Sequence, residues 1–155
     1  VEPLLEVLGP EPFDDWNADI AAKKCRGKRS PIKTTLLDQR FVVGVGNIYA
    51  CEALHNAGIA PTKLASKLVT KAGKPTKSLA RLVDEVKIVL NKAIAAGGST
   101  LNDFADVDGN LGYFSHHFTI YGREDQPCLK EGCAGTVERI VQSNRSTFWC
   151  PRCQK

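Results

Sequence analysis

The sequence predicts a mainly α-helical domain followed by a small zinc-binding β-hairpin. Three observations support this fold class. Apolar residues between positions 78 and 96 recur at steps of three and four, which is typical of a helix with one buried face. A glycine-rich junction, FVVGVGN, separates two shorter helical stretches. Four of the six cysteines gather near the C-terminus in two close pairs.

Composition limits the class of protein further. With 43% apolar and 25% charged residues, the chain is ordinary globular material, which excludes a disordered tail, a collagenous fibre and a bare coiled coil. The uncharged apolar stretch at residues 41–51 is only about half of the roughly 20 apolar residues that a membrane span needs. The first twenty residues hold six carboxylates and no Lys or Arg, unlike an export signal. We therefore expect a cytoplasmic protein with no membrane partner.

Three short helices are expected in the first third of the chain. An Asp or Asn side chain that accepts a backbone N–H can start a helix, and a proline is favoured at the first helical position. A glycine that follows the last helical residue commonly ends one. The expected helices run from Asp14 or Asp15 to about Cys25, from Ser30-Pro31 through Leu37, and from Asn47 to Gly58.

The clearest helix is expected over Ser78–Ala96. Its apolar residues fall on one face, and Gly97-Gly98 supplies the stop. This stripe is interpreted as core, with no cofactor role. Its members are Leu79, Leu82, Val83, Val86, Leu90, Ala93 and Ile94.

Charge is distributed unevenly along the chain. Residues 23–40 contain seven bases and only one acid, directly after the acidic N-terminal stretch. A block this basic is typical of a surface that binds a polyanion. It is equally typical of a solvated helix face, so both interpretations stay open at this point.

The junction GVGN is a second candidate binding feature. Glycine lets the backbone approach a ligand closely, and the amides at a helix N-terminus favour an anion such as phosphate. Asn47 either caps its own helix or donates its side-chain amide to the anion. Alone, the pattern is more often a plain turn. The basic block just before it favours phosphate binding, because the two joined helices would present Lys33 and Asn47 toward one side.

The C-terminal cysteines have the spacing of a metal site. They read C-x4-C, sixteen residues, then C-x2-C. Each pair offers two sulfurs from one tight turn, and TVERIV and RSTFW, joined at residues 142–144, form the hairpin that returns the chain and closes a tetrahedron with Zn–S near ~2.3 Å. We favour one structural Zn²⁺ over a disulfide or redox pair, with no open position for catalysis. The ligands are Cys128, Cys133, Cys150 and Cys153, whereas Cys25 and Cys51 are expected to be core thiols.

These motifs resemble a known family. LLDQRFVVGVGNIYACEALHNAGIAP, GGSTLNDF, DGNLGYF, YGREDQPC and QSNRSTFWCPRCQK together look like the C-terminal half of formamidopyrimidine-DNA glycosylase. The resemblance implies a helix–two-turn–helix domain and a zinc finger, although the first cysteine pair has the spacing x4 where x2 is more familiar. The expected divisions are a residual interdomain linker over 1–12, the helical DNA-binding domain over 13–115 and the finger over 116–155.

The resemblance also implies an activity. Family enzymes excise oxidised purines, such as 8-oxoguanine and formamidopyrimidines, by base flipping and Schiff-base chemistry, with a following AP-lyase step. Their nucleophile is an N-terminal proline followed by Glu, whereas this chain begins Val1-Glu2-Pro3. We therefore expect a fragment without the N-terminal β-rich catalytic domain, inactive alone because covalent catalysis needs the attacking amine. Its partner would be damaged double-stranded DNA, bound by a monomer associated with the bacterial nucleoid.

Individual residues inherit roles from the resemblance. Lys33, Asn47 and the Gly46 amide match positions that grip phosphates, and Lys28 or Arg29 matches a DNA contact. Arg145 matches the finger arginine that binds phosphate and is also described as the proton donor in elimination; the first role suits a guanidinium better. The loop 108–114 resembles a segment that closes over the damaged base, or it is an ordinary connection. The residues singled out in that loop are Gly109, Gly112 and Tyr113.

Two alternatives remain. The parent could be a relative of endonuclease VIII, which shares the turn and the finger but prefers oxidised pyrimidines; the GYF and YGR segments favour the purine enzyme. The chain could instead be a non-catalytic zinc-ribbon adaptor that binds nucleic acid or protein.

Overall fold

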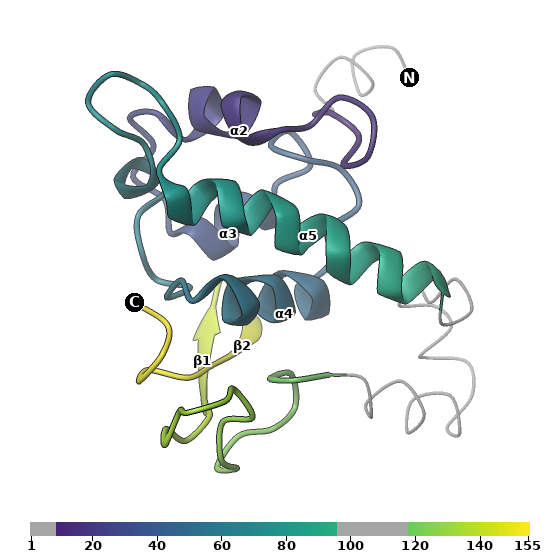
Figure 1. Ribbon diagram of the computed structural model, residues 1–155, viewed down its shortest axis with the longest axis vertical. Coiled ribbons are helices and arrows are strands. Elements are labelled where there is room, and N and C mark those ends of the chain that lie inside the picture. Colours follow the sequence, from purple (N-terminus) through teal and green to yellow (C-terminus); the bar gives the residue numbers. More distant parts are fainter. Residues whose placement is uncertain (1–8, 96–117) are drawn as a thin grey trace.

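The computed structural model describes residues 9–95 and 118–155. Within these residues the protein is mainly helical and ends in one antiparallel hairpin, which confirms the predicted fold class. Figure 1 shows the helices stacked above the hairpin and its loops. The elements are α2 (Ala18–Cys25), α3 (Ile32–Leu37), α4 (Asn47–Ala57), the 3₁₀ turn η1 (Ala65–Leu68), α5 (Lys77–Ala95), β1 (Glu138–Gln142) and β2 (Arg145–Trp149).

Helix α5 lies across α2 and α4 and closes the main core (Figure 1). Its buried stripe agrees with the prediction from Leu79 to Leu90 and adds Val89. Ile94 was expected in the core but is 59% exposed, because it sits in the last turn, where α5 runs beyond α4. The main core therefore collects apolar side chains from each of the four α-helices within residues 9–95.

The start of α2 differs from the expectation, whereas α4 begins at Asn47 as predicted. Helix α2 is capped by Asn17, whose Oδ1 accepts the Ile20 N–H at 2.9 Å, so the predicted cap at Asp14 or Asp15 was wrong. The reason is Trp16, which is buried edge-to-face against Phe41 and holds the preceding chain outside the helix. Helix α4 has Gly46 as its N-cap residue, with no side-chain cap. Its end at Gly58, with a left-handed φ of 75°, agrees with the prediction.

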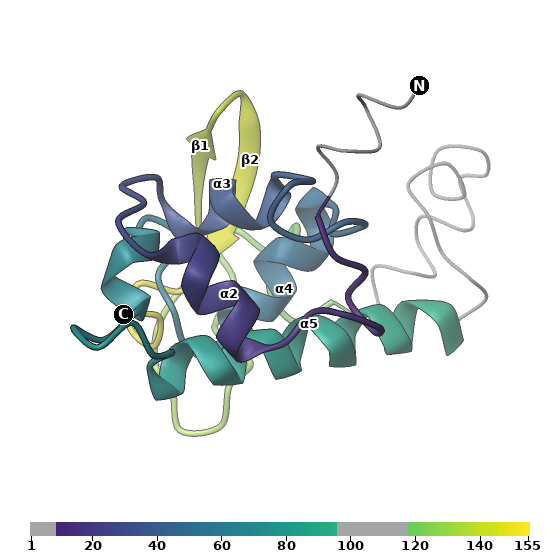
Figure 2. The same ribbon diagram turned by 90° about the horizontal axis from the view of Figure 1, so that it is seen from above.

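The hairpin pairs Glu138 with Trp149 at one end and Gln142 with Arg145 at the other. Ser143 and Asn144 have φ values of 50° and 66°, the signature of a two-residue type I′ turn. Strand β2 packs on α4, and Figure 2 shows the hairpin projecting from the side opposite α5. Arg145 therefore stands at an exposed tip beside the helical part.

The junction between the helical part and the finger is a second apolar cluster. Cys51, from α4, lies in it together with Ile120, Phe148 and two of the metal-site cysteines. Both Cys51 and Cys25 are buried, and burial raises the pKa of the Cys25 thiol to about 12, against a smaller lowering by Lys28. These two cysteines are core thiols, as predicted.

Candidate zinc site and phosphate-binding surface

The four predicted cysteines converge on one point. Their sulfur atoms all lie within 4.8 Å of one another. The Sγ atoms of Cys128 and Cys153 are 3.8 Å apart, and those of Cys133 and Cys150 are 3.6 Å apart. A tetrahedron with Zn–S of ~2.3 Å requires S···S of about 3.8 Å, so the arrangement fits a zinc ion and is too wide for disulfides. When bound, such a zinc holds the fold together and offers no open coordination position.

The backbone around the sulfurs is shaped to the cluster. A Cβ atom on Gly135 would lie 2.5 Å from the Cys150 sulfur and 2.8 Å from Cβ of Arg152, so only glycine fits there. Gly132 turns the chain between the first two ligands with φ of 79°. Burial first, and the neighbouring Cys150 and Cys128 sulfurs second, raise the pKa of Cys153. The Cys153 thiol therefore resists losing its proton unless a cation supplies compensating charge.

Glu52, on α4, anchors the chain that enters the finger. Its carboxylate is 4% exposed and accepts the backbone N–H groups of residues 119, 120 and 121 at 2.8–2.9 Å. Tyr121 then packs against Phe148 of the hairpin, with ring centroids 4.7 Å apart. Sequence reasoning missed Glu52, because its partners lie 67 to 69 positions away and no spacing rule links them.

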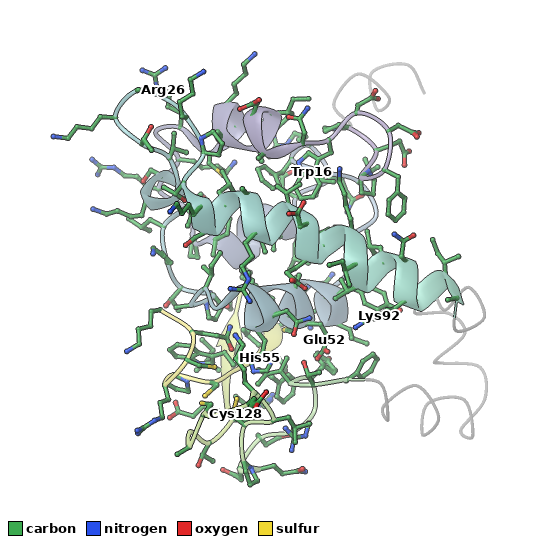
Figure 3. All side chains as sticks on the ribbon, in the orientation of Figure 1. Trp16, Arg26, Glu52, His55, Lys92 and Cys128 are labelled. Atoms are coloured by element: carbon green, nitrogen blue, oxygen red, sulfur yellow. The ribbon has the colours of Figure 1, made fainter. Side chains whose placement is uncertain are left out.

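His55, one turn further along α4, contacts the metal site itself. Nε2 lies 3.3 Å from the Cys128 sulfur and Nδ1 lies 3.1 Å from the Thr119 hydroxyl. Figure 3 shows Glu52 and His55 on the side of α4 that faces Cys128. Burial lowers the pKa of His55 to about 4, and the charges of Lys130 and Arg123 act in the same direction. The ring is therefore neutral near pH 7. This contact was also absent from the sequence predictions.

The end of the chain is tied to the same region. Gln154 is 2% exposed; its side chain accepts the Cys150 N–H and donates to the Ile59 carbonyl. The Lys130 ammonium donates to the His55 carbonyl at 2.8 Å. The finger is thus docked on α4 and the loop after it by hydrogen bonds as well as by apolar contact.

The predicted phosphate-binding residues meet at the N-terminal end of α4. The Asn47 side chain accepts a hydrogen bond from the Lys33 ammonium and donates to the Ser146 carbonyl at 3.0 Å. Ser146 adjoins Arg145, whose side chain is exposed and whose charge contributes to lowering the pKa of Lys33. The tip of the hairpin and the start of α4 therefore lie on one side of the molecule.

Lys33 and Asn47 differ in how deeply they are buried, and this difference gives them different roles. Lys33 has no exposed surface and its ammonium lies behind the Asn47 amide, whereas Asn47 retains 8% exposure. Burial is the main cause that lowers the pKa of Lys33. Gly44 provides the left-handed turn, φ 86°, and its N–H donates to the Gln39 side chain. The first amides of α4 have no partner within the helix, and no side chain caps them.

A second basic segment, residues 63–81, lies beside the predicted basic block at residues 23–40. Sequence reasoning missed it. Backbone bonds join Ser66 to Lys28 and Ala65 to Ser30, and the Arg26 guanidinium lies over Gly73. Between residues 20 and 83 there are thirteen bases and two acids, against eight bases and fifteen acids elsewhere. Among the described residues the only ion pair recorded is Arg40–Asp38. The basic flank comprises Lys23, Lys24, Arg26, Lys28, Arg29, Lys63, Lys67, Lys71, Lys74, Lys77 and Arg81.

Some predicted residues fall outside the part of the chain that the structure describes. These include the loop over 108–114 with Gly109, Gly112 and Tyr113. Within the described residues, no helix combines the length and the apolar character needed to cross a bilayer.

A helix–glycine turn–helix unit with a docked four-sulfur finger defines a zinc-finger protein of the helix–two-turn–helix class. Two family models match: the formamidopyrimidine-DNA glycosylase H2TH domain over residues 8–105, and a zinc finger found in FPG and IleRS over residues 125–155. The chain belongs to the formamidopyrimidine-DNA glycosylase H2TH family. The second match and the sulfur geometry confirm the prediction of one structural zinc.

Known proteins align with nearly the whole chain. It is 52% identical to formamidopyrimidine-DNA glycosylase of Bradyrhizobium sp. (strain ORS 278), covering 99% of this chain and 53% of that protein. Lactococcus lactis Fpg in complex with DNA containing an abasic site is 31% identical, with a TM-score of 0.80 over 99% of this chain and 54% of that one. MutM in complex with DNA containing carbocyclic 8-oxo-G is 31% identical, with a TM-score of 0.78 over 98% of this chain and 52% of that one. The chain therefore spans about half the length of these relatives.

Proposed function

We propose that this chain is the DNA-binding portion of a base-excision-repair glycosylase that removes oxidised purines. The observation that carries the proposal is the convergence of Asn47, Lys33 and the hairpin tip at the uncapped start of α4. The names of the relatives and their complexes with damaged DNA support the same function. They favour a purine enzyme over the endonuclease VIII alternative and over a non-catalytic adaptor.

In this proposal the α4 start and Arg145 form a phosphate clamp. The Gly46 amide, the second Asn47 amide hydrogen and the Arg145 guanidinium are the donors, because backbone amides at a helix start and guanidinium groups both favour phosphate oxygens. Lys33 acts through Asn47: it orients the amide and places a positive charge behind it. A charge about 5 Å from a phosphate contributes about 3 kcal/mol at an effective dielectric of 20. The clamp would hold the backbone around an extruded nucleotide, offsetting the few kcal/mol that base flipping costs.

The basic flank extends this surface beyond the clamp. Its exposed cations have no ion-pair partner among the described residues, so they are available to phosphates further along the duplex. Such contacts position DNA without reading its sequence. Lys28 and Arg29, at the start of α3, would join the flank to the clamp.

The division between linker, helical domain and finger at residues 12 and 115 remains part of the proposal, as does action by a monomer at the nucleoid. Excision itself needs a nucleophile, and the chain covers only 53% of the relative that it matches at 52% identity. We expect this chain alone to bind DNA without cutting it. Borohydride trapping on 8-oxoguanine or abasic DNA should yield no covalent adduct; an adduct through Val1 or a lysine would contradict this expectation.

Binding to a short duplex at several salt concentrations tests the proposed function. We expect weak binding without base preference and a steep loss of affinity as salt rises, with Arg145→Ala reducing the salt slope by about one phosphate. Lys92→Ala, an exposed change on α5 outside both the clamp and the basic flank, is the matched control and should leave the slope unchanged. A dissociation constant independent of salt would refute the clamp and favour a protein-binding adaptor.

A further inference from the structure

Helix α4 presents one side chain directly to the sulfur cluster. His55 is 2% exposed, and each of its ring nitrogens has a partner: Nε2 faces the Cys128 sulfur at 3.3 Å and Nδ1 faces the Thr119 hydroxyl at 3.1 Å. The ring thus connects a zinc ligand with the segment that Glu52 anchors. None of the zinc ligands lies on α4, so His55 is a contact between the helical part and the ligand set itself.

The partner of Nε2 decides whether that nitrogen carries a hydrogen. A metal-bound thiolate has no proton and can only accept a hydrogen bond. With zinc bound, Nε2 must therefore carry a hydrogen and donate it to the Cys128 sulfur. The Thr119 hydroxyl, which can donate or accept, holds the other ring nitrogen.

We propose that His55 is a positioning residue of the zinc site: its Nε2–H···S bond holds the Cys128 sulfur in place. Four thiolates around one Zn²⁺ leave two net negative charges in a half-buried site, and an N–H donor offsets part of that charge. Partners of this kind behind a metal ligand typically alter metal affinity by about 10- to 100-fold.

Nuclear magnetic resonance of the zinc-loaded chain tests the Nε2–H donor directly. A long-range ¹H–¹⁵N spectrum should show His55 with hydrogen on Nε2, and replacement of zinc by ¹¹³Cd should give a scalar coupling between the metal and that hydrogen. An Nε2 without hydrogen in the metal-loaded protein, or the absence of that coupling, would overturn the proposal. This test needs no variant and does not depend on DNA binding or activity.

The rate of zinc release to an excess of chelator tests whether the His55 hydrogen bond slows the loss of the metal. His55→Phe keeps the ring volume without a donor and should release zinc about tenfold faster. His55→Gln, whose amide can donate over a similar length, should stay within about threefold of the parent. Thr119→Val removes the hydroxyl that holds the ring at Nδ1 and should raise the rate, whereas Thr119→Ser should not. Equal release rates for the parent and His55→Phe, or equal acceleration by Phe and Gln, would show that the ring only fills space.

Discussion

Truncation of Glu52 to alanine should destabilise the protein by about 3 kcal/mol. The carboxylate accepts three backbone N–H groups at 2.8–2.9 Å. Ile120 is fully buried, so its orphaned N–H costs about 1–3 kcal/mol, while the half-buried Thr119 and Tyr121 N–H groups recover water and cost less, about 1 kcal/mol each. The substitution also removes the cost of burying the Glu52 carboxylate charge, which offsets part of the summed cost of the three N–H groups. The remainder is a large share of the roughly 5–15 kcal/mol that holds a domain folded.

Urea unfolding of the zinc-saturated chain, followed by circular dichroism, measures this loss. With an m-value of about 2 kcal/mol/M, the midpoint should fall by about 1.5 M. Glu52→Gln keeps one acceptor oxygen and should lose an intermediate amount. Asp84→Ala removes an exposed carboxylate from α5 and should change stability by less than about 0.5 kcal/mol. If Glu52→Ala matched this control, the carboxylate would not anchor the finger as described.

Three further predictions follow from the same structure. Gly135→Ala should weaken zinc binding and cost about 1–3 kcal/mol, because its Cβ would overlap the Cys150 sulfur; Gly122→Ala, with a left-handed φ of 76° but open space, should lose stability without loss of zinc affinity in a chelator competition. Chelation of zinc should unfold the hairpin, seen in Trp149 fluorescence, while most helical circular dichroism remains, because the helices have their own core. DNA affinity should fall as pH rises toward 10.5: burial lowers the pKa of Lys33, so above that lowered value the free protein holds Lys33 neutral and phosphate binding must take up a proton. Lys33→Gln should bind more weakly and lose this pH dependence; a pH dependence that persisted in it would assign the proton elsewhere.

Local patterns account for what the sequence could predict. The apolar repeat of α5 and the two cysteine pairs each lie within a short window, where helical period and ligand spacing act directly. The GVGN turn and the hairpin tip could be placed for the same reason. The predictions for Ile94 and for the α2 cap were wrong because tertiary packing decided both positions. Helix α5 extends past its neighbour α4, and Trp16 is buried in the core.

Contacts between distant segments could not be predicted in this way. Glu52 and His55 look like ordinary members of the helix CEALHNAG, and their partners lie 64 to 73 positions away. The burial of Lys33 depends on Asn47, which in turn contacts Ser146 across 99 positions. The basic flank did leave a signal: the stretch 53–83 contains six bases and no acid, which sets it apart from the rest of the chain.

Neutralising one phosphate at a time tests whether Asn47 and Arg145 act on the same stretch of DNA backbone. Each phosphate of a duplex containing a lesion analogue would be replaced in turn by an uncharged methylphosphonate, and affinity measured for the parent, Asn47→Ala and Arg145→Ala. We predict that the parent loses most affinity at one phosphate or at two adjacent ones, and that both variants lose sensitivity at those positions. Loss of sensitivity at separate, distant phosphates in the two variants would contradict a shared clamp.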